Sequence, residues 1–247
     1  MELQGSRAII TGGASGLGAA TAAHFAQRGA QVTILDMAET GAEYAASIGA
    51  GFQRTDVTDE TSVAAAIAAA VETMGGIDIC VNCAGIATGE KTIGRDGPHD
   101  LARFRRTIEI NLIGTFNVLR LAAAEMAQNG RPENGVIVNT ASIAAFDGQA
   151  GQAAYAASKA AIAGMTLPIA RDLARQGIRI MAIAPGIFGT PMLRGLPQEV
   201  QDGLAAEVTF PKRLGDPDEY ARTAAFIVES GYLNGETIRL DGALRMR

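Results

Sequence analysis

The sequence predicts a single α/β domain with a doubly wound, three-layer fold, in which helices cover both faces of a seven-stranded parallel sheet. Short segments rich in Ile and Val alternate with longer, Ala-rich amphipathic segments, a pattern typical of repeated strand–helix–strand units. The chain has 247 residues, 48% of them hydrophobic and 19% charged, so it can bury a large core without disulfides or a structural metal. No repeat or interdomain linker divides it, and residues 1–247 are expected to form one domain.

The first half of the chain is expected to alternate between strands and helices. Short, mostly apolar segments predict strands at residues 7–11, 31–36, 51–54 and 78–82. Apolar side chains at helical spacing predict helices at residues 16–28, 39–48 and 60–74.

The second half contains longer elements and two long loops. Strands are predicted at residues 135–140, 178–184 and 236–240. Helices are predicted at 101–128 and 152–176, because Gly or Asn follows each one where it would stop. The Pro-containing segments 87–100 and 186–217 are too long for ordinary turns, so we expect them to be substrate-side loops or a lid.

Charge and hydropathy exclude several classes of partner. The net charge is −5, from 21 basic and 26 acidic residues, which argues against a nucleic-acid binder with a basic face. No apolar run approaches the roughly 18 residues of a membrane span, and the first residues lack the features of a secretion signal. A cytoplasmic protein without a membrane partner is expected.

The two cysteines, Cys80 and Cys83, have the C-x-x-C spacing of a redox dithiol or half a zinc site. They fall in and just after a predicted strand, however, where positions three apart face opposite sides. Only two histidines, His24 and His99, could add metal ligands. We therefore expect ordinary thiols in a reducing compartment and no metal.

A glycine-rich loop directly follows the first predicted strand. The segment TGGASGLG contains Gly12, Gly16 and Gly18 and opens into the helix 16–28. Glycines allow a tight turn there, and they let backbone amides and the helix N-terminus approach a pyrophosphate. Glycines in such a turn can also be purely structural, but the position after a strand favours a dinucleotide site.

Asp36 ends the second predicted strand, 18 residues after Gly18. A carboxylate at this position can accept hydrogen bonds from both hydroxyls of an adenosine ribose, although it could instead be a strand-end cap. Residues 37–40 contain no Arg or Lys to neutralise a 2′-phosphate, so the prediction is NAD rather than NADP. Asp56 and Val57 after the third strand, and Cys83, Ala84 and Gly85 after the fourth, could contact the adenosine or could be plain loop residues.

Tyr155 and Lys159 are spaced i, i+4 and project from one face of the helix predicted at 152–176. An adjacent ammonium favours a phenolate, so Lys159 is expected to lower the pKa of Tyr155 and make it a proton acceptor. From spacing alone, such a pair is more often a solvated helix face.

Ser142 and Asn111 complete the candidate catalytic set. Ser142 follows the fifth predicted strand at the sheet edge where doubly wound folds bind ligands, and its hydroxyl could orient the oxygen that Tyr155 deprotonates. A nucleophilic serine is disfavoured because no G-x-S-x-G elbow with a histidine base is present. Asn111, polar within an apolar helical stretch, could hold a water that links Lys159 to solvent, or could be a structural amide.

With these residues, the chain resembles the short-chain dehydrogenases/reductases, which have a three-layer Rossmann fold, from about Ser6 to Met246. Further segments, including AAFDGQ at 144–149, APGIFGTP at 184–191 and RLGDP at 213–217, resemble the type-2 (short-chain) 3-hydroxyacyl-CoA dehydrogenases. The resemblance implies NAD-dependent oxidation of L-3-hydroxyacyl-CoA to 3-ketoacyl-CoA in fatty-acid or branched-chain breakdown by a homotetramer, with an acyl-CoA as the small-molecule partner.

The family roles transfer to matching positions. The resemblance implies that Tyr155 is the base, that Lys159 binds the nicotinamide ribose, that Ser142 orients the hydroxyl and that Asn111 takes part in a proton relay. Gln149, with Ser142 and Tyr155, would contact the substrate. The implied cofactor-binding residues are Gly12, Ser15, Gly16, Leu17, Gly18, Asp36, Asp56, Val57, Cys83, Ala84, Gly85, Tyr155, Lys159, Pro185, Phe188 and Thr190.

Two departures and three alternatives accompany this interpretation. Cys83 replaces the superfamily's usual Asn, and segment 87–100 is shorter than in animal members, which leaves open whether Lys91 and Arg95 meet CoA phosphates or are simply solvated. The substrate could be another secondary alcohol such as a hydroxysteroid. A 3-oxoacyl-carrier-protein reductase is disfavoured because Asp36 opposes NADPH. A non-catalytic NAD-binding sensor or scaffold would have no use for an activated phenol.

Overall fold

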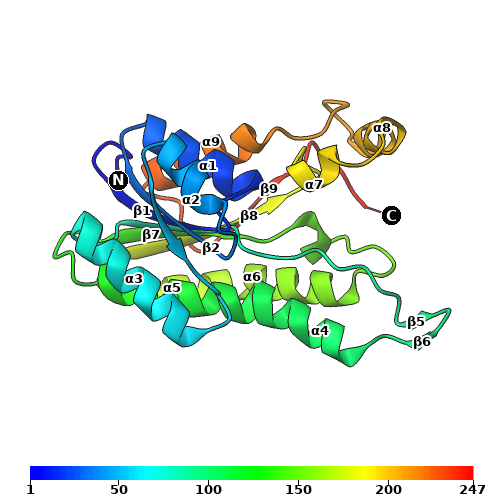
Figure 1. The fold of residues 1–247 in the computed structure, drawn as a ribbon, viewed down its shortest axis with the longest axis horizontal. Helices are drawn as coiled ribbons and strands as arrows, with labels where there is room; N and C mark the ends of the chain where they lie inside the picture. The colour runs from blue at the N-terminus through cyan, green and yellow to red at the C-terminus, as the bar shows by residue number, and fades with distance from the viewer. Residues whose placement is uncertain (247) are drawn as a thin grey trace.

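The seven predicted strands form one parallel sheet in the computed structural model, which describes residues 1–246 (Figure 1). The order across the sheet is β3-β2-β1-β4-β7-β8-β9, and every neighbouring pair is parallel. The strands are β1 (Arg7–Thr11), β2 (Gln31–Asp36), β3 (Gly51–Arg54), β4 (Ile79–Asn82), β7 (Gly135–Thr140), β8 (Ile178–Pro185) and β9 (Thr237–Leu240). The order reverses between β1 and β4, and ligands of doubly wound sheets bind at such a switch point.

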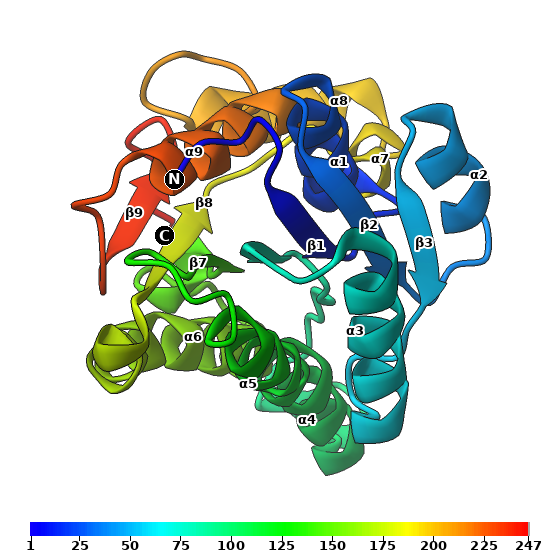
Figure 2. The ribbon, with the colours of Figure 1, turned by 90° about the vertical axis from the view of Figure 1, so that its left-hand side faces the viewer.

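Helices cover both faces of the sheet, as the alternating sequence pattern predicts (Figure 2). One face carries α1 (Gly16–Gln27), α2 (Gly41–Ser47) and α9 (Pro217–Glu229). The opposite face carries α3 (Glu60–Met74), α4 (Leu101–Ile108), α5 (Gly114–Met126) and α6 (Ala153–Asp172). Each face has its own core: Ile10 packs into the first and its neighbour Ile9 into the second, because strand side chains alternate.

The predicted helix 101–128 is interrupted. The structure has α4, a π-helical turn at Glu109–Ile113 that contains Asn111, and then α5. The apolar spacing continues through the turn, so the sequence pattern does not reveal it, although such turns occur often at functional sites. The helix predicted at 152–176 ends as α6 at Asp172 and continues as a 3₁₀ turn at Ala174–Gln176.

Helix α9 was missing from the predicted elements. It begins with a capping box: the side chain of Asp216 accepts a hydrogen bond from the backbone of Glu219, and the side chain of Glu219 accepts one from the backbone of Asp216. Pro217 occupies the first turn of the helix. Its apolar residues pack on α1, and the fully buried Tyr220 belongs to the core. This start signal lies in the sequence, at the end of the predicted loop 186–217.

Both predicted substrate loops contain some regular structure. Segment 87–100 forms a small antiparallel hairpin of β5 (Ile93–Gly94) and β6 (Gly97–Pro98), which projects from the body below the sheet in Figure 1. Segment 186–217 contains the short helices α7 (Pro191–Arg194) and α8 (Gln198–Glu207). Among residues 1–246, no helix is long and apolar enough to cross a membrane.

Candidate active site

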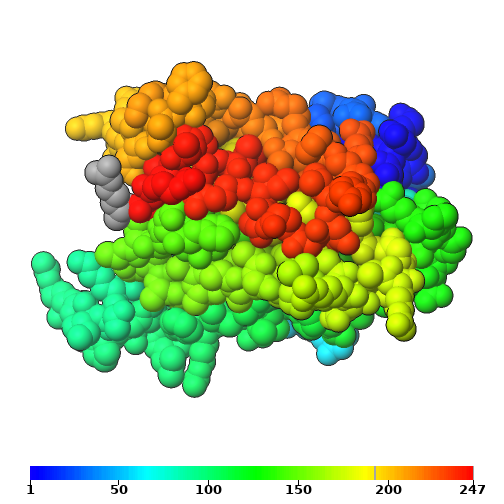
Figure 3. All heavy atoms as spheres, turned by 180° about the vertical axis from the view of Figure 1, so that it is seen from behind, coloured from blue at the N-terminus to red at the C-terminus, as the bar shows by residue number. Residues whose placement is uncertain are grey.

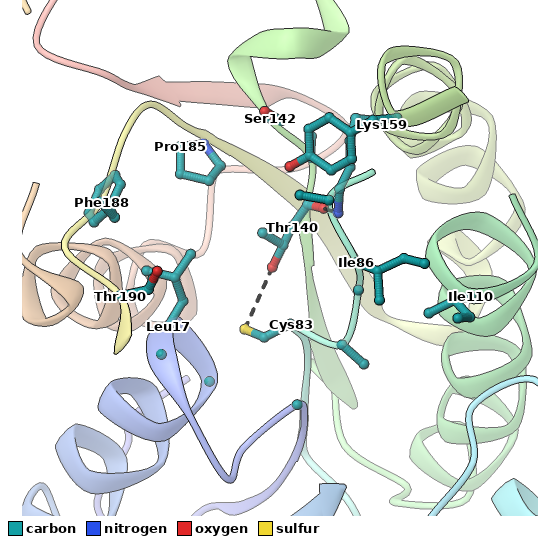
Figure 4. A pocket seen from close by; sticks show the side chains of 18 of the residues that line it. Leu17, Cys83, Ile86, Ile110, Thr140, Ser142, Lys159, Pro185, Phe188 and Thr190 are labelled. Carbon is teal, nitrogen blue, oxygen red and sulfur yellow. Dashed lines mark hydrogen bonds between the residues drawn. The ribbon is translucent and has the colours of Figure 1, made fainter. Parts of the chain in front are cut away.

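A cavity of about 980 Å³ opens at the carboxyl ends of the strands (Figure 4). Its walls come from segments far apart in the chain: Leu17 and Thr190 lie on one side, Ile86 and Ile110 on the other, and Ser142 at one end (Figure 4). All the predicted site residues line this cavity except Asn111, which lies fully buried behind its wall. The sheet topology therefore gathers the predicted cofactor and catalytic residues into one site.

The glycine-rich loop has the geometry that a pyrophosphate cradle requires. Gly12 has φ +64°, and a Cβ there would lie 2.8 Å from the backbone nitrogen of Ala84. A Cβ on Gly18 would lie only 2.2 Å from the carbonyl oxygen of Gly12. The side chain of Ser15 makes no capping hydrogen bond to α1, and the first turn of α1 has no acidic residue, so its N-terminus can receive an anion. These residues fit a bound dinucleotide.

Asp36 stands at the end of β2, where the cavity begins. Its carboxylate accepts hydrogen bonds from the backbone nitrogens of Ala14 and Ala38, each at 3.0 Å. The carboxylate therefore tethers the glycine-rich loop and still has lone pairs for ribose hydroxyls. Met37, the next residue along the cavity wall, is 57% exposed and carries no charge.

The opposite wall follows the loops after β3 and β4. The side chain of Asp56 accepts hydrogen bonds from the backbone nitrogen and hydroxyl of Thr58, at 2.9 and 2.7 Å, so it caps its own loop. The thiol of Cys83 accepts a hydrogen bond from the Thr140 hydroxyl at 3.5 Å (Figure 4). Asp56 and Cys83 thus have structural roles in addition to facing the cavity.

Lys159 is anchored inside the protein. Its side chain is buried, and Nζ donates a hydrogen bond to the carbonyl oxygen of Thr140 at 2.7 Å. Burial lowers the pKa of Lys159 to about 8, so the side chain is still mainly protonated at neutral pH. The nearby aromatic ring of Tyr155 has its centre 5.8 Å from Nζ.

The expectation that the pKa of Tyr155 is lowered is wrong. Burial raises the pKa of the phenol above its usual range, and a hydrogen bond with Ser142 offsets only part of this rise. The i, i+4 spacing reveals the charge of Lys159, whereas the loss of water around the phenol depends on tertiary packing. A raised pKa keeps Tyr155 protonated at neutral pH, which suits a proton donor.

Ser142 and Gln149 form the end of the cavity beyond the tyrosine. Ser142 Oγ accepts a hydrogen bond from the backbone nitrogen of Ala144 at 3.1 Å, which fixes its position after β7. Gln149 faces the same space seven residues later. Lys91 and Arg95, by contrast, are exposed on the hairpin and are not among the residues that line the cavity.

Asn111 holds the loop after β4 in place. Its Nδ2 donates to the carbonyl oxygen of Ile86 at 2.9 Å and to Ser158 Oγ at 3.1 Å, while its Oδ1 accepts from the backbone nitrogen of Ile86 at 2.8 Å. The amide is thus a structural support between two walls. Its part in a proton relay stays a prediction.

Three supporting residues escaped the sequence analysis. Ser158 donates to the carbonyl oxygen of Tyr155 at 2.7 Å and so links it to Asn111. Thr140 bonds the hydroxyl of Tyr220 at 2.7 Å. Ser158 lies within the same helical turn as Tyr155, and this spacing is a usable signal. Tyr220 lies in the unpredicted helix α9, whose capping box marks the helix but not the contact with Thr140.

The cysteines lie as predicted. Cys80 is fully buried in the core below the sheet, where burial raises its pKa to about 12, whereas Cys83 reaches the cavity. Within residues 1–246, no group of three or more His, Cys, Asp or Glu side chains could hold a metal.

Comparisons with known proteins identify the family. A family model described as "Enoyl-(Acyl carrier protein) reductase" matches residues 12–244. The chain is 54% identical over 254 residues to 3-hydroxyacyl-CoA dehydrogenase type-2 of Bos taurus, covering 100% of this chain and 97% of that one. It is 54% identical over 246 residues to the Drosophila melanogaster protein of the same name, covering 96% of each. A crystal structure of 3-hydroxyacyl-CoA dehydrogenase type-2 from Mycobacterium avium matches with a TM-score of 0.93 and 44% identity over 100% of this chain and 99% of that one. The chain therefore belongs to the short-chain dehydrogenase/reductase family of oxidoreductases.

Proposed function

We propose that the protein oxidises L-3-hydroxyacyl-CoA to 3-ketoacyl-CoA, reversibly, with NAD as the cofactor. The observation that carries the proposal is the placement of Ser142, Tyr155 and Lys159 in one cavity, in a chain 54% identical over its full length to a protein named for this activity. The resemblance of segments 144–149 and 184–191 to the same subfamily also supports the substrate class.

The cofactor choice rests on Asp36. A carboxylate at the end of β2 favours ribose hydroxyls and repels a 2′-phosphate, and residues 37–40 supply no basic side chain to offset this repulsion. The glycine cradle and the N-terminus of α1 would hold the pyrophosphate. When bound, NAD supplies the hydride acceptor for the oxidation.

The reacting atoms are positioned by the protein side chains. Ser142 Oγ, fixed by Ala144, would hold the substrate oxygen beside the Tyr155 phenol. Tyr155 would take the hydroxyl proton during oxidation and return it during reduction. Lys159, held on the carbonyl oxygen of Thr140, would bind the nicotinamide ribose and place a positive charge near the phenol. That charge favours the phenolate which oxidation requires.

We also propose that the protein is a homotetramer. Ile113 and Phe116, near the start of α5, are 45% and 46% exposed, and Phe226 on α9 is 59% exposed. Apolar side chains on helices of both faces would gain from burial between subunits. Multi-angle light scattering should give about four times the mass of one chain; the mass of a single chain would refute this assembly.

The decisive assay mixes purified protein with acetoacetyl-CoA and either NADH or NADPH and follows the absorbance of the reduced nicotinamide. We expect rapid oxidation of NADH, slow oxidation of NADPH and turnover by Tyr155→Phe that is slower by roughly 10²- to 10⁴-fold. NADH binding without turnover of acetoacetyl-CoA would overturn the substrate assignment, and activity with a hydroxysteroid or another secondary alcohol would then replace it.

A further inference from the structure

Arg239 on β9 contacts two segments that are far apart in the chain and both reach the cavity. One nitrogen of its guanidinium group donates to Asp147 Oδ2 at 2.5 Å, and Nε donates to Asp241 Oδ2 at 2.8 Å. The guanidinium also lies 5.2 Å from the centre of the Phe146 ring. Arg239 itself does not line the cavity.

The first of these segments carries substrate-side residues. Phe146 and Asp147 lie between Ser142, which caps the 3₁₀ turn after β7, and Gln149, which faces the cavity two residues after Asp147. The segment begins with a 3₁₀ turn at Ile143–Ala145, and the backbone nitrogens of Phe146 and Asp147 both donate to the carbonyl oxygen of Ile143 at 2.9 Å. No helix or strand covers residues 146–149 before α6 begins.

The second segment is the C-terminal tail after β9. Asp241 accepts hydrogen bonds from the backbone nitrogen of Ala243 at 2.9 Å and from Arg245 at 3.0 Å, while Arg239 reaches the carbonyl oxygen of Leu244 at 3.2 Å. Met246, two residues after Leu244, lines the cavity. In Figure 3 the red C-terminal segment lies directly against the green and yellow-green atoms of the segment before α6 and of α6 itself.

We infer that Arg239 is a positioning residue that sets the spacing between the Gln149 wall and the Met246 wall of the substrate site. A planar guanidinium bonds two carboxylates in fixed directions and stacks flat on an aromatic ring, whereas the ammonium of a lysine is a point charge without this fixed geometry. The ion pair is shielded: Arg239 and Asp147 have side-chain exposures of 23% and 21%, and Asp241 of 7%. Charge-assisted bonds at partly buried sites hold their geometry better than those on an open surface.

The catalytic residues are anchored independently of Arg239. Lys159 is held by Thr140, and Tyr155 by Ser158 and the rest of α6. Loosening the Arg239 contacts should therefore weaken substrate binding and leave the chemical step and the cofactor site intact. The inference rests on the proposed function for its choice of acetoacetyl-CoA as the probe.

The test compares Asp147→Asn, Arg239→Met and Arg239→Lys with Arg28→Met, a matched control that removes another ion pair, with Glu229, on the α1 and α9 side. For Asp147→Asn and Arg239→Met, we expect the KM for acetoacetyl-CoA to rise roughly fivefold, kcat to stay within about twofold and the Kd for NADH to be unchanged. Arg239→Lys should fall between these variants and the wild type. The double variant Asp147→Asn/Arg239→Met should resemble Arg239→Met alone, because each of these variants lacks the ion pair between Asp147 and Arg239.

Hydrogen exchange provides a readout that does not depend on activity. In Arg239→Met and Asp147→Asn, backbone amides in 146–149 and 242–246 should exchange faster, and those of 143–145, which hold Ser142, and of α6 and β8 should not. Unchanged exchange in both segments, or a loss confined to kcat, would overturn the inference. If the wild-type protein fails to reduce acetoacetyl-CoA, the proposed function fails, and the exchange data still decide the role of Arg239.

Discussion

The ammonium group of Lys159 lies 5.8 Å from the centre of the Tyr155 ring, and it donates its hydrogen bond to the carbonyl oxygen of Thr140 at 2.7 Å. Thr140 is the last residue of β7, so the sheet itself holds the lysine in place. The hydroxyl of Thr140 is in turn bonded to the buried Tyr220 of α9. The charge near the phenol is therefore fixed by the central strand and by both helical layers.

Replacing Tyr155 by Phe should remove the proton donor and leave the cavity intact. Loss of general acid–base catalysis costs roughly 10²- to 10⁴-fold, so kcat should fall by this factor. The Kd for NADH, measured by fluorescence titration, should change little. Tyr232→Phe is the matched control, because Tyr232 is fully exposed and far from the site in sequence. A Tyr155→Phe enzyme that retains more than a tenth of wild-type kcat would contradict this role.

Replacing Lys159 by Met should change how stability depends on pH. The pKa of Lys159 is lowered to about 8 in the folded protein, so the unfolded chain binds more protons between about pH 8 and 10.5, and raising the pH stabilises the wild type in that window. Below pH 8 the wild type carries the full cost of a buried charge. Denaturant unfolding should therefore show Lys159→Met gaining stability relative to the wild type at pH 7, with this gain shrinking by on the order of 2 kcal/mol at pH 10.

The control for this measurement is Lys212→Met on the surface. Its unfolding free energy relative to the wild type should be the same at both pH values. A difference between Lys159→Met and the wild type that is independent of pH would show that Lys159 has no lowered pKa.

Replacing Asp36 by Asn together with Met37 by Arg should reverse the cofactor preference. The change removes the charge that repels a 2′-phosphate and adds a cation that pairs with it, so the ratio of kcat/KM for NADPH to that for NADH should rise by about 100-fold or more. Met37→Arg alone keeps the carboxylate and should shift the ratio much less. An equal ratio in the two variants would show that Asp36 does not select the cofactor.

Replacing Asn111 by Ala should destabilise the protein more than replacing Ser158 by Ala. The buried Asn111 side chain makes three hydrogen bonds, two of them to the backbone of Ile86. Ser158→Ala removes only a donor to the carbonyl oxygen of Tyr155 and an acceptor for Asn111 Nδ2. Unpaired buried groups cost about 1–3 kcal/mol each, so Asn111→Ala should lower the unfolding free energy by roughly 2–4 kcal/mol and Ser158→Ala by about 1 kcal/mol. Equal losses would contradict the support that Asn111 gives to Ile86.

Most of the strands and the cofactor motif follow from local sequence, because each depends on residues close together in the chain. The bounds of β1, β2, β3 and β7 and of α3 agree with the predictions, since their ends are marked by turn residues or caps. The glycine cradle is equally local, because the turn and the start of α1 lie within eight residues.

The errors arise where distant segments decide the outcome. Asn111, in the π-helical turn, contacts Ile86 and Ser158, which lie 25 and 47 residues away in the chain. The spacing of apolar residues predicts neither contact. The pKa of Tyr155 depends on its burial, which several segments produce together. The absence of α9 from the predicted elements is a separate case, because the caps of this helix are local and its start adjoins a long predicted loop.

The sequence by itself determined the alternation of strands and helices, the glycine-rich turn before α1, the acidic residue at the end of β2 and the i, i+4 pairing of Tyr155 with Lys159, since spacing along one chain encodes each of them. Only the tertiary structure decided which groups hold those residues: Thr140 for Lys159, Asn111 for Ile86 and Arg239 for the two walls of the substrate site. These contacts join residues 19, 25 and 92 positions apart, and burial, hydrogen bonding and charge pairing over such separations exist only once the sheet and its helices have packed.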